Sequence, residues 1–114
     1  MLKRYTATSV TASGDTTYTV GENTLQMKTL VTVPSGKECA IVGIDIQNGG
    51  TNASVAVTVS RSGSVVSAMH FTLVAYDFIS IDSKEFLEAG DTISFGATAA
   101  GLLCAVSCDL SDVE

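Results

Sequence analysis

The chain of 114 residues is long enough to bury one hydrophobic core but too short for two. Hydrophobic residues make up 46% of it, charged residues only 16%, and Trp is absent. The formal net charge is −6 and the six Lys and Arg residues are scattered, so the chain lacks the clustered positive charge that binds phosphates. We therefore expect a single domain, residues 1–114, that makes no direct contact with nucleic acid.

The N-terminal residues include Lys3 and Arg4, but no apolar run of the length of a secretory signal follows them. Apolar runs elsewhere in the chain end well before the roughly 20 residues that a membrane-spanning helix needs. We therefore expect a protein that is made in the cytoplasm without a signal peptide and has no membrane partner. The number of cysteines is odd, and we expect Cys39, Cys104 and Cys108 to be free thiols.

The first 20 residues are rich in Thr and Ser and poor in large apolar side chains. Such a segment suits a polar edge strand, which guards a sheet against unwanted pairing. It equally suits an N-terminal arm that reaches a neighbouring subunit. The sequence leaves both alternatives open for residues 1–20.

From residue 25 to residue 60, apolar and polar residues alternate in three segments, which is the period of a β-strand. Turn-forming sequences separate the segments, namely Pro-Ser-Gly-Lys at 34–37 and Asn-Gly-Gly at 48–50. The apolar positions of one parity are Leu25, Met27, Val31 and Val33 in the first segment, Ala40, Val42, Ile44 and Ile46 in the second, and Val55, Val57 and Val59 in the third.

After a hairpin turn at residues 61–64, the segment 65–73 has apolar residues of both parities, which predicts a central strand partly covered on both faces. Further strands are predicted at 78–81, 86–87, 92–97 and 102–110. About eight short strands at intervals of about ten residues, without a convincing helix between them, predict an all-β fold. We expect an antiparallel β-sandwich of jelly-roll or immunoglobulin-like type.

Few residues are candidates for chemistry. His70 is the only histidine, and no Ser-His-Asp or Cys-His order with a recognisable spacing surrounds it. It lies between Met69 and Phe71, and these three residues fit either the core or a subunit interface; we favour the core. On a strand, the sulfurs of Cys104 and Cys108 would be about 13 Å apart, too far for one zinc ion or a disulfide. Both cysteines are expected to act as small apolar residues in the core.

The acidic side chains between residues 77 and 91 have neither the spacing of an EF-hand nor the aromatic cleft of a glycosidase. In the sequence Glu-Ala-Gly-Asp at 88–91, Gly suits a chain reversal and Asp can accept backbone hydrogen bonds. We therefore predict a turn that leads into the strand at 92–97. The acidic residues considered are Asp77, Asp82, Glu85, Glu88 and Asp91.

Two stretches, TLVTVPSGKECAIVGIDIQNGG at 29–50 and FLEAGDTISFGATAAGLLCAVSCDL at 86–110, together resemble small structural proteins of tailed bacteriophages. The shared pattern is a strand ending in V-P-x-G-K, a strand ending in Asn, and a later L-x-x-G-D-x-I. The resemblance implies a non-enzymatic virion protein that decorates the capsid or belongs to the neck or tail. It also implies that its partners are copies of itself and other virion proteins, and that it has no catalytic, cofactor-binding or metal-binding residues.

A carbohydrate-binding or surface-binding β-sandwich is the alternative function. Such a module stacks sugar rings on exposed aromatic side chains, and the tyrosines available for this are Tyr5, Tyr18 and Tyr76. From the sequence alone these three cannot be assembled into a row. A metal-dependent jelly-roll enzyme would need clustered His and Glu ligands, which a chain with one histidine does not offer.

Overall fold

The fold is all-β, as the sequence predicts. A computed structural model describes residues 1–83 and 85–113. Within these residues the chain forms ten antiparallel strands and no helix. None of the described segments is therefore a helix that could cross a bilayer. The strands are β1 (Leu2–Thr8), β2 (Thr16–Val20), β3 (Asn23–Thr32), β4 (Lys37–Gln47), β5 (Ala53–Arg61), β6 (Ser64–Leu73), β7 (Phe78–Ile81), β8 (Phe86–Leu87), β9 (Thr92–Ala97) and β10 (Leu103–Asp112).

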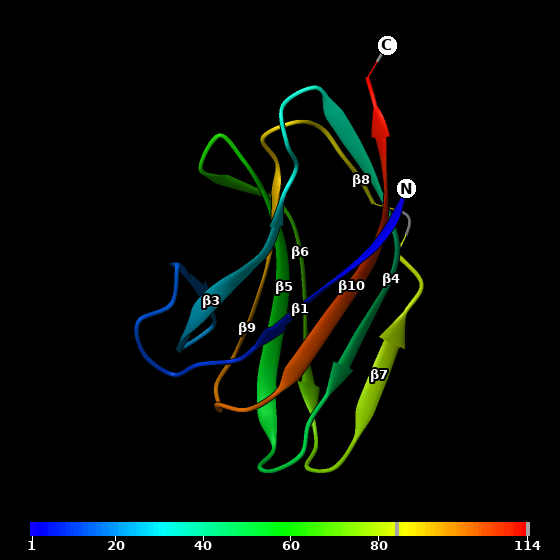
Figure 1. The fold of residues 1–114 in the computed structure, drawn as a ribbon. Coiled ribbons are helices and arrows are strands. Elements are labelled where there is room, and N and C mark those ends of the chain that lie inside the picture. The colour runs from blue at the N-terminus through cyan, green and yellow to red at the C-terminus, as the bar shows by residue number, and fades with distance from the viewer. Residues whose placement is uncertain (84, 114) are drawn as a thin grey trace.

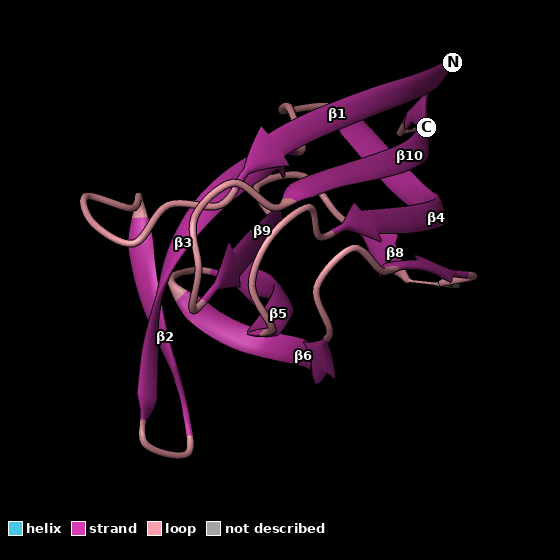
Figure 2. Ribbon diagram, turned by 90° about the horizontal axis from the view of Figure 1, so that it is seen from below, coloured by secondary structure: helices cyan, strands magenta, loops and turns pink. Residues whose placement is uncertain are grey.

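The strands form two sheets that pack face to face (Figures 1 and 2). Sheet A has the order β1-β10-β4-β7. β7 pairs with residues 44–47 of β4, and β8 pairs with residues 39–40 near the other end of the same strand. Sheet B has the order β2-β3-β9-β5-β6. The molecule is elongated, with extents of 45 × 25 × 20 Å, and Figure 2 shows the β2–β3 hairpin projecting beyond the two layers.

The strand order is that of a jelly roll. When the short strands β2 and β8 are set aside, the remaining strands run first-eighth-third-sixth in sheet A and second-seventh-fourth-fifth in sheet B. Two interleaved Greek keys produce this order. The structure therefore selects the jelly roll from the two sandwich types that the sequence left open. In this topology the β4–β5, β6–β7 and β9–β10 connections meet at one end of the sandwich, here called the loop end.

The main core lies between the sheets, because alternate residues of each strand face the opposite sheet. It draws on every long strand of both sheets except β1, whose side chains pack at its margin, and β6 contributes only its last residue, Leu73. Its largest fully buried members are Phe95, Ile44, Ile46, Leu87, Ile93, Leu102, Val33, Val55, Val57 and Val106.

A β-bulge in β3 divides apolar residues that share one parity in the sequence. Met27 pairs with Gly96 and Val31 pairs with Ile93, so the register against β9 shifts by one residue at Leu30. Val31 and Val33 therefore face the main core, whereas Leu25 and Met27 pack with Ala56 in a second cluster on the outer face of sheet B. Parity could not reveal this division because a bulge reverses the facing of every residue beyond it.

The prediction that residues 65–73 form a central strand is wrong, because β6 is the edge strand of sheet B and pairs with β5 alone among the described strands. Met69 and Phe71 pack against the core, whereas Val65 and Val66 are exposed. A bulge opposite the Val59–Ser60 step places both valines outside the core. The apolar residues of both parities in this segment therefore belong to a partly exposed edge strand and not to a strand that is buried on both faces.

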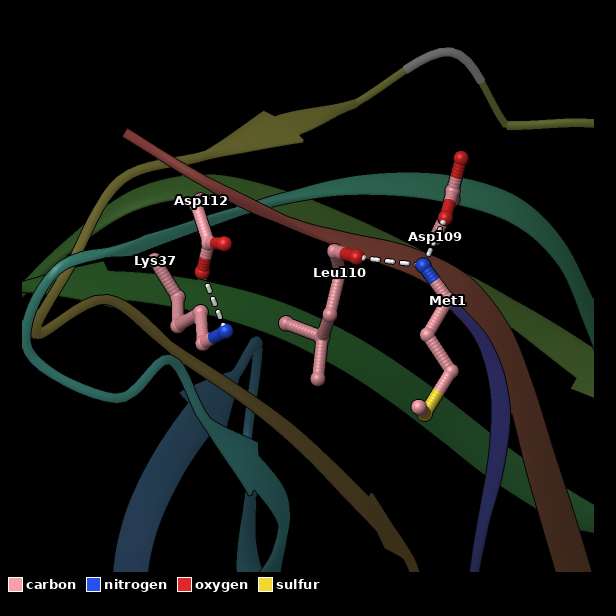
Figure 3. Close-up of polar contacts among 5 residues, drawn as sticks. All are labelled: Met1, Lys37, Asp109, Leu110 and Asp112. Carbon is pink, nitrogen blue, oxygen red and sulfur yellow. Dashed lines mark hydrogen bonds and ion pairs between the residues drawn. The ribbon is translucent and has the colours of Figure 1, made fainter. Parts of the chain in front are cut away.

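Residues 1–20 form edge strands of both sheets. β1 pairs with β10 at the edge of sheet A, and β2 pairs with β3 at the edge of sheet B. Figure 3 shows the N-terminal amine of Met1 beside β10, where it donates to Asp109 Oδ1 at 2.9 Å and to the Leu110 carbonyl at 2.6 Å. In the same view Lys37 is paired with Asp112 near the end of β10.

The predicted hairpin turn at residues 61–64 is confirmed, because Arg61 pairs with Ser64 across a two-residue turn. Ser62 and Gly63 have φ values of 53° and 81°, as a type I′ turn requires. The predicted turn at 88–91 is also confirmed. The Asp91 N–H donates to the Glu88 carbonyl at 3.0 Å, and Gly90 has a φ of 88°.

Candidate functional site

The acidic segment 77–91 is divided between the two ends of the molecule. Asp77 lies in the β6–β7 connection at the loop end, whereas Glu88 and Asp91 lie in the β8–β9 turn at the opposite end. The residues that the structure describes contain no group of three or more His, Cys, Asp or Glu side chains placed to hold a metal ion.

Asp91 is the one acidic residue of this segment that is almost fully buried, with 1% of its surface exposed. Its carboxylate accepts two hydrogen bonds from Arg61, at 2.9 Å from Nε and 2.8 Å from Nη2, and a third from the Glu88 N–H at 2.9 Å. Its own carbonyl accepts from the Val33 N–H. The site therefore ties three turns together and leaves the carboxylate no open side for a substrate.

The Arg61 guanidinium is the main cause that holds the pKa of Asp91 below its ordinary value, with a further contribution from the Glu88 N–H. Burial alone would raise this pKa, so the hydrogen bonds outweigh desolvation. Arg61 in turn has a raised pKa because of Asp91. A carboxylate with a shifted pKa is often catalytic, but here Asp91 and Arg61 are engaged with each other in a structural contact.

His70 lies on the exposed side of β6, opposite Ala56 of β5. The favoured placement of Met69, His70 and Phe71 in the core is thus right for Met69 and Phe71, which pack against it, and wrong for His70. The period of two explains the difference, because neighbouring residues of a strand face opposite sides.

All three cysteines are free, and each is fully buried in the main core. Burial raises the pKa of Cys104 to about 12. The pKa of Cys39 is also raised, first by burial and then by the neighbouring Cys108 thiol. Sequence spacing could not show that Cys39 and Cys108 are neighbours, because they meet across the β4–β10 pairing. Buried thiols with raised pKa values are poor nucleophiles.

The outer face of sheet A has exposed large apolar side chains at both ends and a polar centre. Phe78, Gln47 and Leu103 are in register across β7, β4 and β10 at the loop end, whereas Val42 and Phe86 lie towards the other end. The centre is polar, because Asp45 accepts a hydrogen bond from Ser80 and forms an ion pair with Arg4.

β6 is the longest of the edge strands, and His70 is its only ionisable side chain. Its ten residues, SVVSAMHFTL, contain no Lys, Arg, Asp or Glu, although the whole chain has a net charge of −6. The edge strand β1 contains Lys3 and Arg4, β2 has five residues and β7 has four. Lysines, short lengths and charges are the usual protections of sheet edges. β6 lacks them, apart from its bulge.

A groove of about 550 Å³ runs beside β6, between the edges of the two sheets. Met69, Ile81 and Phe86 contribute apolar surface to it. Ser67 Oγ donates to Glu85 Oε1 at 2.5 Å across this groove, which fixes β6 relative to the opposite sheet. The sequence did not reveal this surface, because the apolar residues of both parities at 65–73 predict a central strand.

The chain matches no family model, and no curated protein or solved structure matches it either. The function is therefore inferred from the surface features of the jelly roll and from the sequence resemblance at 29–50 and 86–110.

Proposed function

We propose that the protein is a non-enzymatic structural virion protein of a tailed bacteriophage, present in multiple copies on the capsid or at the neck or tail. Its partners are copies of itself and neighbouring virion proteins, and its location is the virion. The phage assignment is supported by the sequence resemblance at 29–50 and 86–110. The jelly roll is compatible with it, since this fold occurs in viral capsid domains but also in lectins and cupins.

The observation that carries the assembly function is the free edge of β6, which contains no Lys, Arg, Asp or Glu. An exposed strand edge presents a row of backbone donors and acceptors that a second strand can pair with. When two copies pair antiparallel through β6, the contact is the same on both sides and can close around a two-fold axis. Because β6 contains no acidic residue, this contact brings no like charges of the strands together.

The outer face of sheet A offers a second contact area for a different virion protein. Exposed aromatic side chains such as Phe86 are of a type that is enriched at protein interfaces. Repetition of such contacts around a symmetric assembly makes weak individual contacts effective. The two surfaces lie on different sheets, so a copy paired through β6 keeps its sheet A face open to a further partner.

The test is the mass in solution of the purified protein over a range of concentrations, measured by light scattering. We expect a defined oligomer for the wild type and a monomer for Ala68→Lys, because Ala68 is exposed in the middle of β6 and Lys opposes edge pairing. The matched control is Val42→Lys, at an exposed position on sheet A, which should keep the oligomer.

A wild type that is monomeric at every concentration would contradict assembly through β6. An oligomer that Val42→Lys dissociates and Ala68→Lys does not would move the self-association to sheet A instead.

A further inference from the structure

A surface hollow of about 490 Å³ lies at the loop end, where the β4–β5, β6–β7 and β9–β10 connections meet. Its lining combines two aromatic rings, an apolar side and polar groups. The residues that matter for recognition are Gln47, Gly49, Tyr76, Asp77, Phe78 and Leu103. None of them belongs to β6, so the hollow is separate from the edge that carries the proposed self-association, whereas Gln47, Phe78 and Leu103 lie at the loop end of the sheet A face.

Two aromatic side chains stand out from the surface at this hollow. Tyr76 is 84% exposed and Phe78 is 68% exposed. Burial of an aromatic ring stabilises a protein more than burial of most other side chains. Two neighbouring rings that remain exposed to water contribute none of this stabilisation to the fold. An exposed aromatic pair beside a hollow therefore indicates a surface that is covered when a ligand binds.

Tyr76 has a backbone conformation that is rare for its residue type. Its φ is 64°, in the left-handed region that favours Gly and, to a lesser degree, Asn and Asp. A bulky residue keeps such a conformation only when its surroundings hold it there, and these positions concentrate at functional sites. A Gly at position 76 would relieve this backbone strain but would also remove the aromatic ring. The chain therefore keeps a strained backbone at the position that carries an exposed aromatic ring.

The surroundings of Tyr76 supply this support. The Asn48 side-chain amide, in a residue that is 97% buried, donates to the carbonyls of Thr51, Leu73 and Val74 at 2.7, 3.0 and 3.2 Å. Its backbone N–H donates to the Asp77 carbonyl at 2.9 Å. The Ala75 N–H donates to the Asn52 side chain at 2.9 Å, so the β6–β7 connection that presents the aromatic rings is cross-linked to the β4–β5 loop by hydrogen bonds. Preorganisation of this kind reduces the entropy that binding costs.

The polar groups of the hollow suit hydroxyl groups. Asp77 accepts a hydrogen bond from the Phe78 N–H through Oδ1, and a carboxylate has several more acceptor sites. Gln47 adds a side-chain amide that both donates and accepts. The carboxylate at the hollow and the net charge of −6 disfavour an anionic ligand.

We propose that this hollow binds a neutral sugar unit of a glycan. The apolar face of a pyranose ring stacks on Tyr76 and Phe78, and its hydroxyl groups donate to Asp77 and exchange hydrogen bonds with Gln47. Carbohydrate binding, the alternative function considered from the sequence, is thus proposed as a property that the molecule has in addition to assembly. The sequence pointed to Tyr76 among the tyrosines but missed Phe78, whereas Tyr5 and Tyr18 are half-buried and lie elsewhere.

The experiment is a titration of the ¹⁵N-labelled protein with maltohexaose, cellohexaose, chitohexaose and mannohexaose, followed by amide chemical shifts. We expect at least one sugar to cause saturable shifts in residues 47–52, 74–78 and 98–103, with a Kd of about 1 mM. Tyr76→Asn should raise that Kd tenfold or more, because Asn accepts the left-handed conformation but lacks the ring. Gly49→Leu should weaken binding similarly, since its side chain would enter open space at the hollow.

The matched control is Val74→Ser, which removes an exposed apolar side chain from the same connection but not from the hollow, and it should bind as the wild type does. The proposal is overturned if none of the four sugars causes saturable shifts up to about 20 mM, or if Tyr76→Asn binds with unchanged affinity. Shifts of Tyr76 and Phe78 that depend on protein concentration and not on sugar would also overturn it, by identifying the rings as a protein contact. Ala68→Lys should bind sugar normally, so failure of assembly through β6 and failure of this site are distinguishable.

Discussion

At the scale of single residues, Asp91 shows how a buried charge is used in a small domain. Its carboxylate is hydrogen-bonded to Arg61 and to a backbone N–H, so its negative charge is neutralised where it is buried. The contact joins the β5–β6 hairpin to the β8–β9 turn, and the Asp91 carbonyl adds the end of β3. Removing one partner of such a contact leaves the other without compensation.

We predict that Asp91→Ala lowers the free energy of unfolding by about 2 kcal/mol, the typical effect of losing hydrogen bonds to a buried charged group. Urea denaturation followed by circular dichroism measures it. Glu22→Gln, which removes an exposed negative charge, is the control and should change stability by less than about 0.5 kcal/mol. Equal effects of the two substitutions would contradict a structural role for Asp91.

The same contact predicts a pH dependence. The pKa of Asp91 is lower in the folded protein than in the unfolded chain, so the unfolded chain binds this proton more readily. The stability that Asp91 contributes is therefore complete above its ordinary pKa of about 4 and is lost as pH falls from there through the lowered value. Between these two pKa values, the free energy of unfolding should decrease more steeply with decreasing pH for the wild type than for Asp91→Asn.

At the scale of elements, the close approach of β3 to β9 depends on a glycine. An ideal Cβ at Gly96 would lie 2.4 Å from Met27 Sδ and 2.7 Å from the Gln26 carbonyl oxygen. The Met27 side chain can move, but the Gln26 oxygen belongs to the backbone of the paired strand. Gly96 therefore allows Met27 to cover the outer face of sheet B beside Ala56.

Gly96→Ala should destabilise the fold by about 2 kcal/mol through overpacking. Thermal unfolding measures the change, and Gly49→Ala serves as control because a Cβ there meets no atom within 4 Å. If Gly96→Ala were as stable as Gly49→Ala, β3 would have room to move away and the second apolar cluster would not constrain it.

At the scale of the whole molecule, net charge opposes the proposed assembly. Copies with a charge of −6 repel one another, whereas the β6 edge through which they would pair contains no acidic residue. Salt screens the repulsion between exposed charges but leaves pairing of backbone groups in place. Charge thus sets how strongly association depends on conditions, and β6 sets where it occurs.

Self-association should therefore strengthen as salt is raised from about 0.02 to 0.3 M. Sedimentation velocity at fixed protein concentration measures this effect. Ala68→Lys should stay monomeric across the salt series. Association that weakens with salt would instead indicate an interface held by opposite charges, such as the Arg4 and Asp45 region of sheet A.

The sequence by itself determined the class of fold and most of its turns. Strand alternation, the two-residue turn at Ser62–Gly63 and the Gly-Asp turn before β9 depend on neighbours in the chain, so they can be predicted from local chemistry. Burial of Cys104 and Cys108 also follows from their place in an apolar stripe.

Only the tertiary structure decided which strands are edges, because edge status depends on partners that are distant in sequence. The position of β6, the opposite facing of Met27 and Val31, and the meeting of Cys39 with Cys108 all follow from pairing register and bulges. The hollow is of the same kind, since Gln47, Tyr76 and Leu103 are brought together by three separate connections. Both proposed functions depend on such surfaces, which form only when the two sheets pack and leave particular edges and loops exposed.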